Sequence, residues 1–191
     1  MAGLIAVGAV FLVAVIWLVA TYNRFVRLRQ HVRESWADID VELKRRYELI
    51  PNLVATVKGY ATHERELLEG VTELRNRAAA NRGSAASQAG AETALMLGMQ
   101  KLFAVVEDYP DLKANTNFLA LQQQLAETED RIAAARRFFN GNVRDMNALR
   151  ETFPSSIVAG MFHFEAETFF ELDSAAERVV PRVDMDSPPE R

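Results

Sequence analysis

The sequence predicts an all-α protein: an antiparallel four-helix bundle with two long helices, the first continuous with an N-terminal transmembrane helix. Three observations support this fold class. Residues 1–23 carry no charged side chain, and Ala2–Ala20 is almost entirely apolar. Beyond that segment apolar residues recur every three or four positions, which is the period of an amphipathic helix. No segment shows the sustained two-residue alternation that is typical of a half-buried strand.

The apolar segment Ala2–Ala20 has the length of a membrane-spanning helix, because roughly 20 apolar residues cross a hydrocarbon core of about 30 Å. Trp17 and Tyr22 stand near its charged end, where amphipathic rings favour the headgroup layer. A signal peptide would begin with basic residues and end at a small-residue cleavage site. A core helix of a soluble protein would rarely be apolar on every face. A membrane anchor therefore explains the segment best.

Four membrane-proximal arginines follow the apolar segment, and no basic residue precedes it. They are Arg24, Arg27, Arg29 and Arg33. Basic residues close to a membrane span favour the cytoplasmic side of the bilayer. The sequence therefore predicts a single-pass protein with its N-terminus outside and its C-terminal domain in the cytoplasm.

The composition argues against several classes of function. The chain has no cysteine, which excludes disulfides and Cys-ligated metal sites. Its net charge of −4 does not suit a nucleic-acid binder, which normally has a basic face. The histidines His31, His63 and His163 lie on separate predicted elements, outside any metal-binding motif. We therefore expect no catalytic residue, no cofactor, no metal and no nucleic-acid partner. An enzyme or metal-dependent module with an unrecognised site is kept as an alternative.

The first helix of the bundle continues from the anchor to Ile50 along one apolar stripe. Pro51 is predicted to end it, because proline clashes with a preceding helical turn and suits the first position of a new helix. A second helix follows from Leu53 to Ala78. The short link predicts a tight hairpin at Pro51, with the two helices antiparallel.

Two further helices complete the predicted bundle. Residues 81–90 have the composition of a loop. The third helix is expected over 91–109. Asn115 or Thr116 is expected to cap the fourth helix, which is long and ends before Pro154.

An aromatic segment over residues 155–179 follows the predicted bundle, with Phe162, Phe164, Phe169 and Phe170 as its rings. It either folds back on the end of the bundle or exposes a contact surface for another subunit, a partner or the membrane. Residues 180–191 have the composition of a disordered tail. The predicted domains are the transmembrane helix 1–22, the helical bundle 23–154, the aromatic segment 155–179 and the tail 180–191.

Charged residues repeat along one face of the first helix. Glu34, Asp38 and Glu42 are spaced by four residues, so they share a helix face. The sequence favours a solvated face with local ion pairs. The alternative is a set of interhelical or partner contacts made by Asp38, Asp40, Lys44, Arg45 and Arg46. Trp36 lies on the apolar stripe and is expected in the core.

Several blocks of the chain together resemble the LemA family. They are Tyr22–Arg29, Ser35–Val54 with its Ser-Trp-Ala-Asp-Ile-Asp and Lys-Arg-Arg-Tyr-Glu-Leu-Ile-Pro-Asn runs, Val57–Ala61, His63-Glu64, Asn147, Phe153-Pro154-Ser155 and Phe169-Phe170. The resemblance covers nearly the whole chain. It implies a bacterial protein with an N-terminal membrane helix, a helical bundle and no general enzymatic activity.

The resemblance also implies a set of signature residues whose role is unassigned, and the simplest interpretation is that they define the first hairpin. They are Tyr22, Asn23, Trp36, Asp40, Lys44, Arg45, Arg46, Pro51 and Asn52. Our candidate interaction residues are these signature residues except Pro51, together with Asp38 and the four phenylalanines of the aromatic segment.

These observations lead to one expectation about function. We expect a non-enzymatic single-pass membrane protein whose cytosolic bundle self-assembles or scaffolds partners at the bacterial inner membrane. The expected partners are the lipid bilayer and further copies of the chain. By association with other members of the family, a membrane protease or another membrane protein is also a candidate partner. A membrane-shaping oligomer is the alternative.

Overall fold

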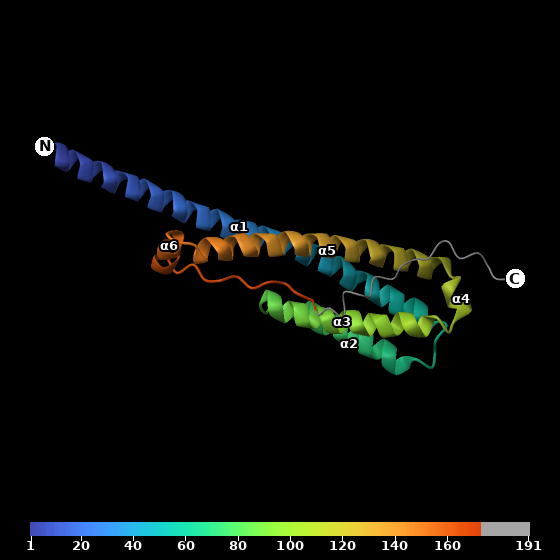
Figure 1. Ribbon diagram of the computed structural model, residues 1–191. Helices are drawn as coiled ribbons and strands as arrows, with labels where there is room; N and C mark the ends of the chain where they lie inside the picture. Colours follow the sequence, from blue (N-terminus) through green and yellow to red (C-terminus); the bar gives the residue numbers. More distant parts are fainter. Residues whose placement is uncertain (173–191) are drawn as a thin grey trace. The chain divides into compact units, whose positions relative to one another are not determined.

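The computed structural model describes residues 1–172, and every regular element in them is a helix (Figure 1). The helices are α1 (Ala2–Lys58), α2 (Arg65–Ala80), α3 (Ala85–Val106), α4 (Pro110–Lys113), α5 (Thr116–Glu151) and α6 (Ser155–Met161). This confirms the all-α class. The tail expected over 180–191 and the end of the aromatic segment lie outside the described residues.

The chain divides into two compact units, and the long helices α1 and α5 each contribute to both. Unit 1 contains residues 1–39 and 135–169, and therefore the start of α1, the end of α5 and α6. Unit 2 contains residues 40–134 and the described residues from Phe170 on. Helices α2, α3 and α4 lie entirely within unit 2.

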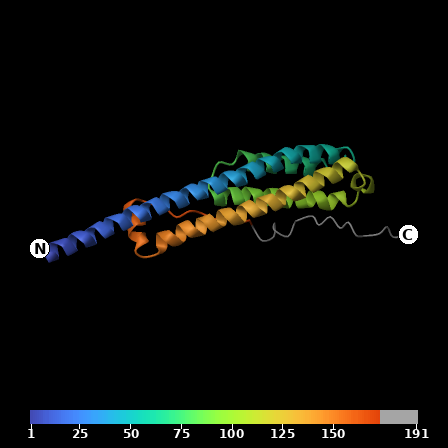
Figure 2. The same ribbon diagram turned by 90° about the horizontal axis from the view of Figure 1, so that it is seen from above.

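The N-terminal part of α1 is long enough and apolar enough to cross a membrane, and none of its most apolar stretch is buried. In both views it extends beyond α6 without a neighbouring helix (Figures 1 and 2). Large side chains such as Leu4, Phe11 and Ile16 are exposed along it. Burying such surfaces away from water is worth about 25 cal/mol per Å². The segment is therefore not a core helix of the described fold, and its exposure fits membrane association.

Helix α1 does not end at Pro51, so the hairpin predicted at that residue is wrong. The helix continues to Lys58, and the turn to α2 occupies residues 59–64. A proline inside a helix removes the N–H that would bond the carbonyl four residues earlier. That carbonyl belongs to Tyr47, and Nε of Arg75 in α2 donates to it at 2.9 Å. A tertiary hydrogen bond replaces the helical one, which explains why α1 continues.

Polar caps set where the later helices begin. The hydroxyl of Ser84 caps α3, so the loop predicted over 81–90 is only 81–84. Oδ1 of Asn115 accepts a hydrogen bond from the N–H of Phe118 at 3.0 Å. This caps α5 and confirms one of the two caps predicted for the fourth helix of the bundle. The one-turn helix α4 escaped prediction, because four residues carry too little periodicity to be recognised.

The core of unit 2 consists of apolar side chains from α1, α2, α3, α4 and α5. Its buried members include Leu43, Ile50, Leu53, Val57, Val71, Leu95, Leu102, Leu112, Leu125 and Ile132. Burial of each such side chain contributes about 1.5 to 3 kcal/mol. Gly98 of α3 lets α2 approach closely, since a Cβ at that position would lie 2.7 Å from Cδ1 of Leu74.

In unit 1 the C-terminal part of α5 packs beside α1 (Figures 1 and 2). The buried apolar side chains are Phe25, Val32 and Ile39 of α1, Phe139, Val143 and Met146 of α5, Val158 and Ala159 of α6, and Phe164. Nδ2 of Asn142 donates to Oγ of the buried Ser35 at 3.1 Å. The ring of Trp36 lies 5.3 Å from that of Phe139. Apolar packing and a polar contact therefore fix this helix pair together.

Candidate functional site

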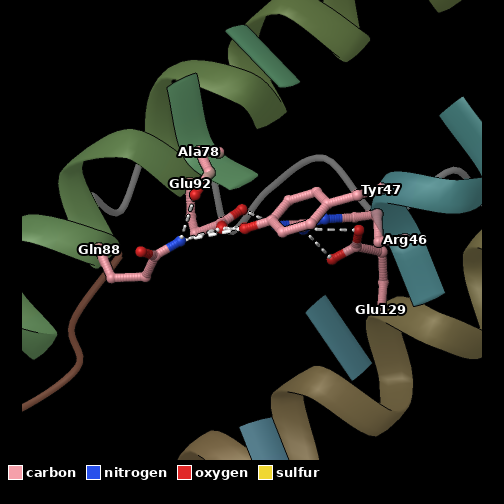
Figure 3. A network of polar contacts seen from close by, with 6 residues as sticks. All are labelled: Arg46, Tyr47, Ala78, Gln88, Glu92 and Glu129. Atoms are coloured by element: carbon pink, nitrogen blue, oxygen red, sulfur yellow. Dashed lines mark hydrogen bonds and ion pairs between the residues drawn. The ribbon is translucent and has the colours of Figure 1, made fainter. Parts of the chain in front are cut away.

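A charged side chain lies in the core of unit 2. Arg46 of α1 is only 2% exposed, and Glu92 of α3 is 1% exposed. The Arg46 guanidinium donates to Glu92, and its Nη1 lies 2.8 and 3.1 Å from the two carboxylate oxygens of Glu129 in α5. Figure 3 shows the guanidinium between the two carboxylates. One cation therefore joins α1 to both α3 and α5.

Tyr47 and Gln88 extend this cluster toward α2. The Tyr47 hydroxyl donates to Oε1 of Glu92. Nε2 of Gln88 lies 2.7 Å from the same oxygen, 3.0 Å from the Tyr47 hydroxyl and 3.1 Å from the carbonyl oxygen of Ala78 (Figure 3). We call Arg46, Tyr47, Gln88, Glu92 and Glu129 the buried polar network. It touches α1, α2, α3 and α5.

Burial sets the electrostatics of the network. Desolvation raises the pKa of the Tyr47 phenol above its ordinary value of 10.0, while the positive charge of Arg46 acts in the opposite direction. The phenol therefore remains a hydrogen-bond donor at neutral pH. A buried ion pair adds little net stability, but removing one partner leaves an uncompensated buried charge and costs about 3 to 5 kcal/mol. Separating α1 from α3 or α5 would therefore leave buried charges without their partners.

The network is placed to hold helices rather than to meet a ligand, since its central side chains are buried. Elsewhere in residues 1–172, no group of three or more His, Asp or Glu side chains is arranged to hold a metal ion. His31, His63 and His163 are all exposed.

The aromatic segment folds back within unit 1 as far as residue 169. The buried ring of Phe164 stacks on Phe25 with centroids 4.6 Å apart. The guanidinium of Arg29 lies 4.9 Å from the centroid of the Phe164 ring. Nε of Arg150 donates to the Phe164 carbonyl at 3.1 Å. Of the two interpretations left open by the sequence, the structure shows folding back for this ring.

An asparagine of α5 holds the backbone of that segment at Glu167. Nδ2 of Asn147 donates to the carbonyl of Glu167, and the N–H of Glu167 donates to Oδ1 of Asn147, both at 2.9 Å. Phe169 is half-buried at the end of unit 1, and Phe170 is buried in unit 2. Phe162 differs from these rings because it is partly exposed, with its centroid 4.8 Å from that of Tyr22.

The remaining sequence candidates are divided between exposed and half-buried positions. Nζ of the exposed Lys44 lies 2.6 Å from Oδ2 of the half-buried Asp40, so these two residues form a local ion pair within α1 and not an interhelical contact. Trp36 is half-buried rather than fully in the core. Exposed positions are Asn23, Asp38, Arg45, Asn52 and three of the membrane-proximal arginines, Arg24, Arg27 and Arg33. Arg46 alone of the charged candidates is buried in interhelical contacts.

Sequence reasoning missed Gln88, Glu92 and Glu129, although one signal was available. Gln88 and Glu92 continue the spacing of Leu95, Met99 and Leu102, so they lie on the buried stripe of α3. Polar residues on such a stripe need buried partners. Arg46 stands in the same way on the stripe of α1, three residues after Leu43.

Comparison with known proteins agrees with the sequence blocks described above. Magnetosome protein MamQ of Magnetospirillum gryphiswaldense is 23% identical over 200 residues, covering 91% of this chain and 74% of that protein. Magnetosome protein MamQ 1 of Paramagnetospirillum magneticum is 23% identical over 185 residues, covering 84% and 68%. Protein LemA of Metamycoplasma hominis is 25% identical over 165 residues, covering 86% and 73%. A model of the LemA family matches residues 35–185, and the chain therefore belongs to that family.

Proposed function

We propose that this chain is a non-enzymatic, single-pass protein of the bacterial inner membrane whose cytosolic helical body assembles with further copies or holds partner proteins. The observation that carries the proposal is the continuity of α1. The helix runs from its apolar segment to buried positions such as Phe25 and Val32 without interruption. A continuous helix holds what packs on it at the membrane more rigidly than a flexible linker would.

The charges next to the apolar segment support a cytosolic body. Arg24, Arg27 and Arg33 are exposed and follow the segment within about one to four helical turns. Basic side chains at this position favour the cytoplasmic face and attract its anionic lipids. The N-terminus would then lie outside.

We further infer that unit 2 is an antiparallel four-helix bundle of residues 40–58, α2, α3 and the first half of α5. Three contacts support this inference. Arg46 joins α1 to Glu92 of α3 and to Glu129 of α5. Arg75 joins α2 to α1 through the Tyr47 carbonyl. Each of the four segments is thus tied by a polar contact to at least one other.

Exposed apolar side chains on the helices support association with further protein. Val41 of α1 is 62% exposed, and Leu119 of α5 is 46% exposed. Single exposed apolar residues also occur on monomers. The oligomeric state of the full chain is therefore the deciding measurement.

Topology can be tested with reporters at the C-terminus of the full-length chain. We expect a fluorescent-protein fusion to be bright and an alkaline-phosphatase fusion to be inactive, because the latter folds only outside the cytoplasm. The reverse pattern would overturn the cytosolic placement. Loss of the first 22 residues from mature protein in cells would overturn the anchor itself.

Assembly can be tested on the same full-length chain. Light scattering of detergent-solubilised protein should give a mass above one chain, or a photo-reactive residue at position 41 should crosslink to a discrete neighbour in cells. A photo-reactive residue at Lys101, which is exposed and polar, serves as the matched control. A monomer without a neighbour specific to position 41 would contradict the proposal.

A further inference from the structure

Helix α6 lies beside α1 where its apolar segment ends. The segment Ala2–Ala20 is about 28 Å long as a helix, which is close to the thickness of a hydrocarbon core. Tyr22 lies two residues after the end of this segment and is therefore expected at the boundary of the bilayer. The ring of Phe162, at the C-terminal end of α6, lies 4.8 Å from that of Tyr22 at an interplanar angle of 61°. This contact places α6 at the level of the boundary.

Helix α6 and the residues that flank it expose four large apolar side chains. Phe153 is 78% exposed, Ile157 55%, Met161 56% and Phe162 42%. We call these four residues the α6 edge. Ile157 and Met161 are four residues apart, so they share a helix face. The other face of α6 packs inward through Ser155, Val158 and Ala159.

The α6 edge lies in a stretch without formal charge. No Asp, Glu, Lys or Arg occurs from Thr152 to Phe164, and Glu151 and Glu165 flank that stretch. Contact between an apolar surface and water is unfavourable, so moving this surface out of water would lower the free energy. A helix with one apolar face can lie in the interface between headgroups and acyl chains.

We propose that the α6 edge inserts into the headgroup layer of the bilayer that α1 crosses. The proposal rests on the membrane-spanning role of α1 proposed above. Two observations favour lipid over a protein occupant. The Tyr22–Phe162 contact makes the α6 edge continuous with the apolar segment. The exposed Arg24 and Arg27 next to that contact suit anionic headgroups.

The inference gives the fold a second membrane contact besides α1. A single helix crossing a bilayer is free to rotate about its own axis and to tilt. Asn147 and Arg150 hold the backbone that follows α6 against α5, so α6 is fixed relative to α1 and α5 within unit 1. An inserted α6 edge would therefore limit both motions and orient unit 1 on the membrane surface.

Because the chain has no cysteine, single introduced cysteines can carry an environment-sensitive fluorophore. The full-length protein is reconstituted in vesicles of phosphatidylcholine with a minor share of phosphatidylglycerol. Quenchers are attached to the lipids near the headgroup or deep in the acyl chain. The labelled variants are Ile157→Cys, Phe138→Cys as the matched control and Ile16→Cys as the marker for the span. Phe138 is exposed and also lies in unit 1, about 20 Å along α5 from the C-terminal end of that helix.

We expect shallow lipid quenchers to reduce the emission of the label at position 157 several-fold more than that of the label at position 138. The label at position 16 should respond to the deep quencher. Quenching at 16 but not at 157 would overturn the α6 insertion while leaving the membrane span intact. If the deep quencher did not reduce the emission of the label at position 16, the proposed function itself would be overturned. Shielding of position 157 from both lipid-borne and water-soluble quenchers would mean that protein covers the α6 edge, and would also overturn the insertion.

A second variant separates insertion from misfolding. Ile157→Glu places a charge on an exposed position, so the fold should be retained, as far-ultraviolet circular dichroism would show. With the fluorophore at Met161→Cys, this substitution should lower shallow quenching to the level found at position 138. Ile157→Leu, which keeps the apolar side chain, should leave the quenching unchanged. Equal quenching of the Glu and Leu variants would overturn the proposal.

Discussion

Arg75 of α2 donates a hydrogen bond of 2.9 Å to the backbone carbonyl of Tyr47, the carbonyl that Pro51 leaves without its helical donor. Pro51 therefore lies within α1 instead of ending it. The proline costs the helix one internal bond, and the arginine restores it from a neighbouring helix. A residue that weakens α1 locally thus creates the polar attachment point for α2.

This relationship predicts coupling between Arg75 and Pro51. Arg75→Leu should lower the free energy of unfolding by about 1 to 3 kcal/mol, because it leaves a carbonyl unsatisfied. In a Pro51→Ala background the same change should cost much less, since the introduced alanine supplies the missing N–H. A double-mutant cycle by thermal or denaturant unfolding measures the coupling. Arg77→Leu, which breaks only the exposed pair with Glu73, is the control and should change stability by less than about 1 kcal/mol.

The buried polar network predicts a large effect at Arg46. Arg46→Met should destabilise the protein by about 3 to 5 kcal/mol, because Glu92 and Glu129 would then be buried or half-buried without their cation. Arg45→Met is the matched control, because Arg45 is next to Arg46 in the sequence but is exposed, so its side chain should contribute little to stability. Denaturation of both full-length variants in detergent measures the difference. Equal free energies of unfolding for the two variants would show that the buried polar network does not stabilise the fold.

Tyr47 predicts a loss of stability in alkali. Burial raises the pKa of its phenol in the folded state above the ordinary value of 10.0, so the folded state favours the protonated form. The resulting stabilisation is complete at pH values below the ordinary pKa of 10.0. It is lost as the pH rises from there through the pKa of the phenol in the folded state. The wild-type free energy of unfolding should therefore fall more steeply above pH 10 than that of Tyr47→Phe. Parallel alkaline slopes for the two proteins would contradict this assignment.

Asn147 predicts local rather than global change. Asn147→Ala removes both hydrogen bonds to the backbone of Glu167 and should free the segment after α6 from α5. Cleavage by a glutamate-specific protease at Glu165 or Glu167 should become faster, while the remaining helices keep their hydrogen-exchange protection. Arg144→Ala, at an exposed position of α5, should leave the cleavage rate unchanged. A uniform loss of protection would instead assign Asn147 to the global core.

Much of the fold could be predicted from the chain alone. The uncharged segment up to Asn23 predicts a helix suited to lipid, and the three- to four-residue spacing of apolar side chains predicts the helices around it. Asn115 was predicted as a possible cap because a cap depends on a side chain and an N–H only three residues away. The sequence blocks also led to the family that the comparisons show.

The tertiary structure decided what depends on residues distant in the chain. Whether Pro51 ends α1 depends on a donor that Arg75 supplies from another helix. Whether Arg46 faces water depends on carboxylates 46 and 83 residues away. Local spacing predicts which side of a helix is apolar, because that property belongs to neighbouring residues. Satisfaction of a buried carbonyl or charge is a property of the assembled fold, and only the packed helices determine it.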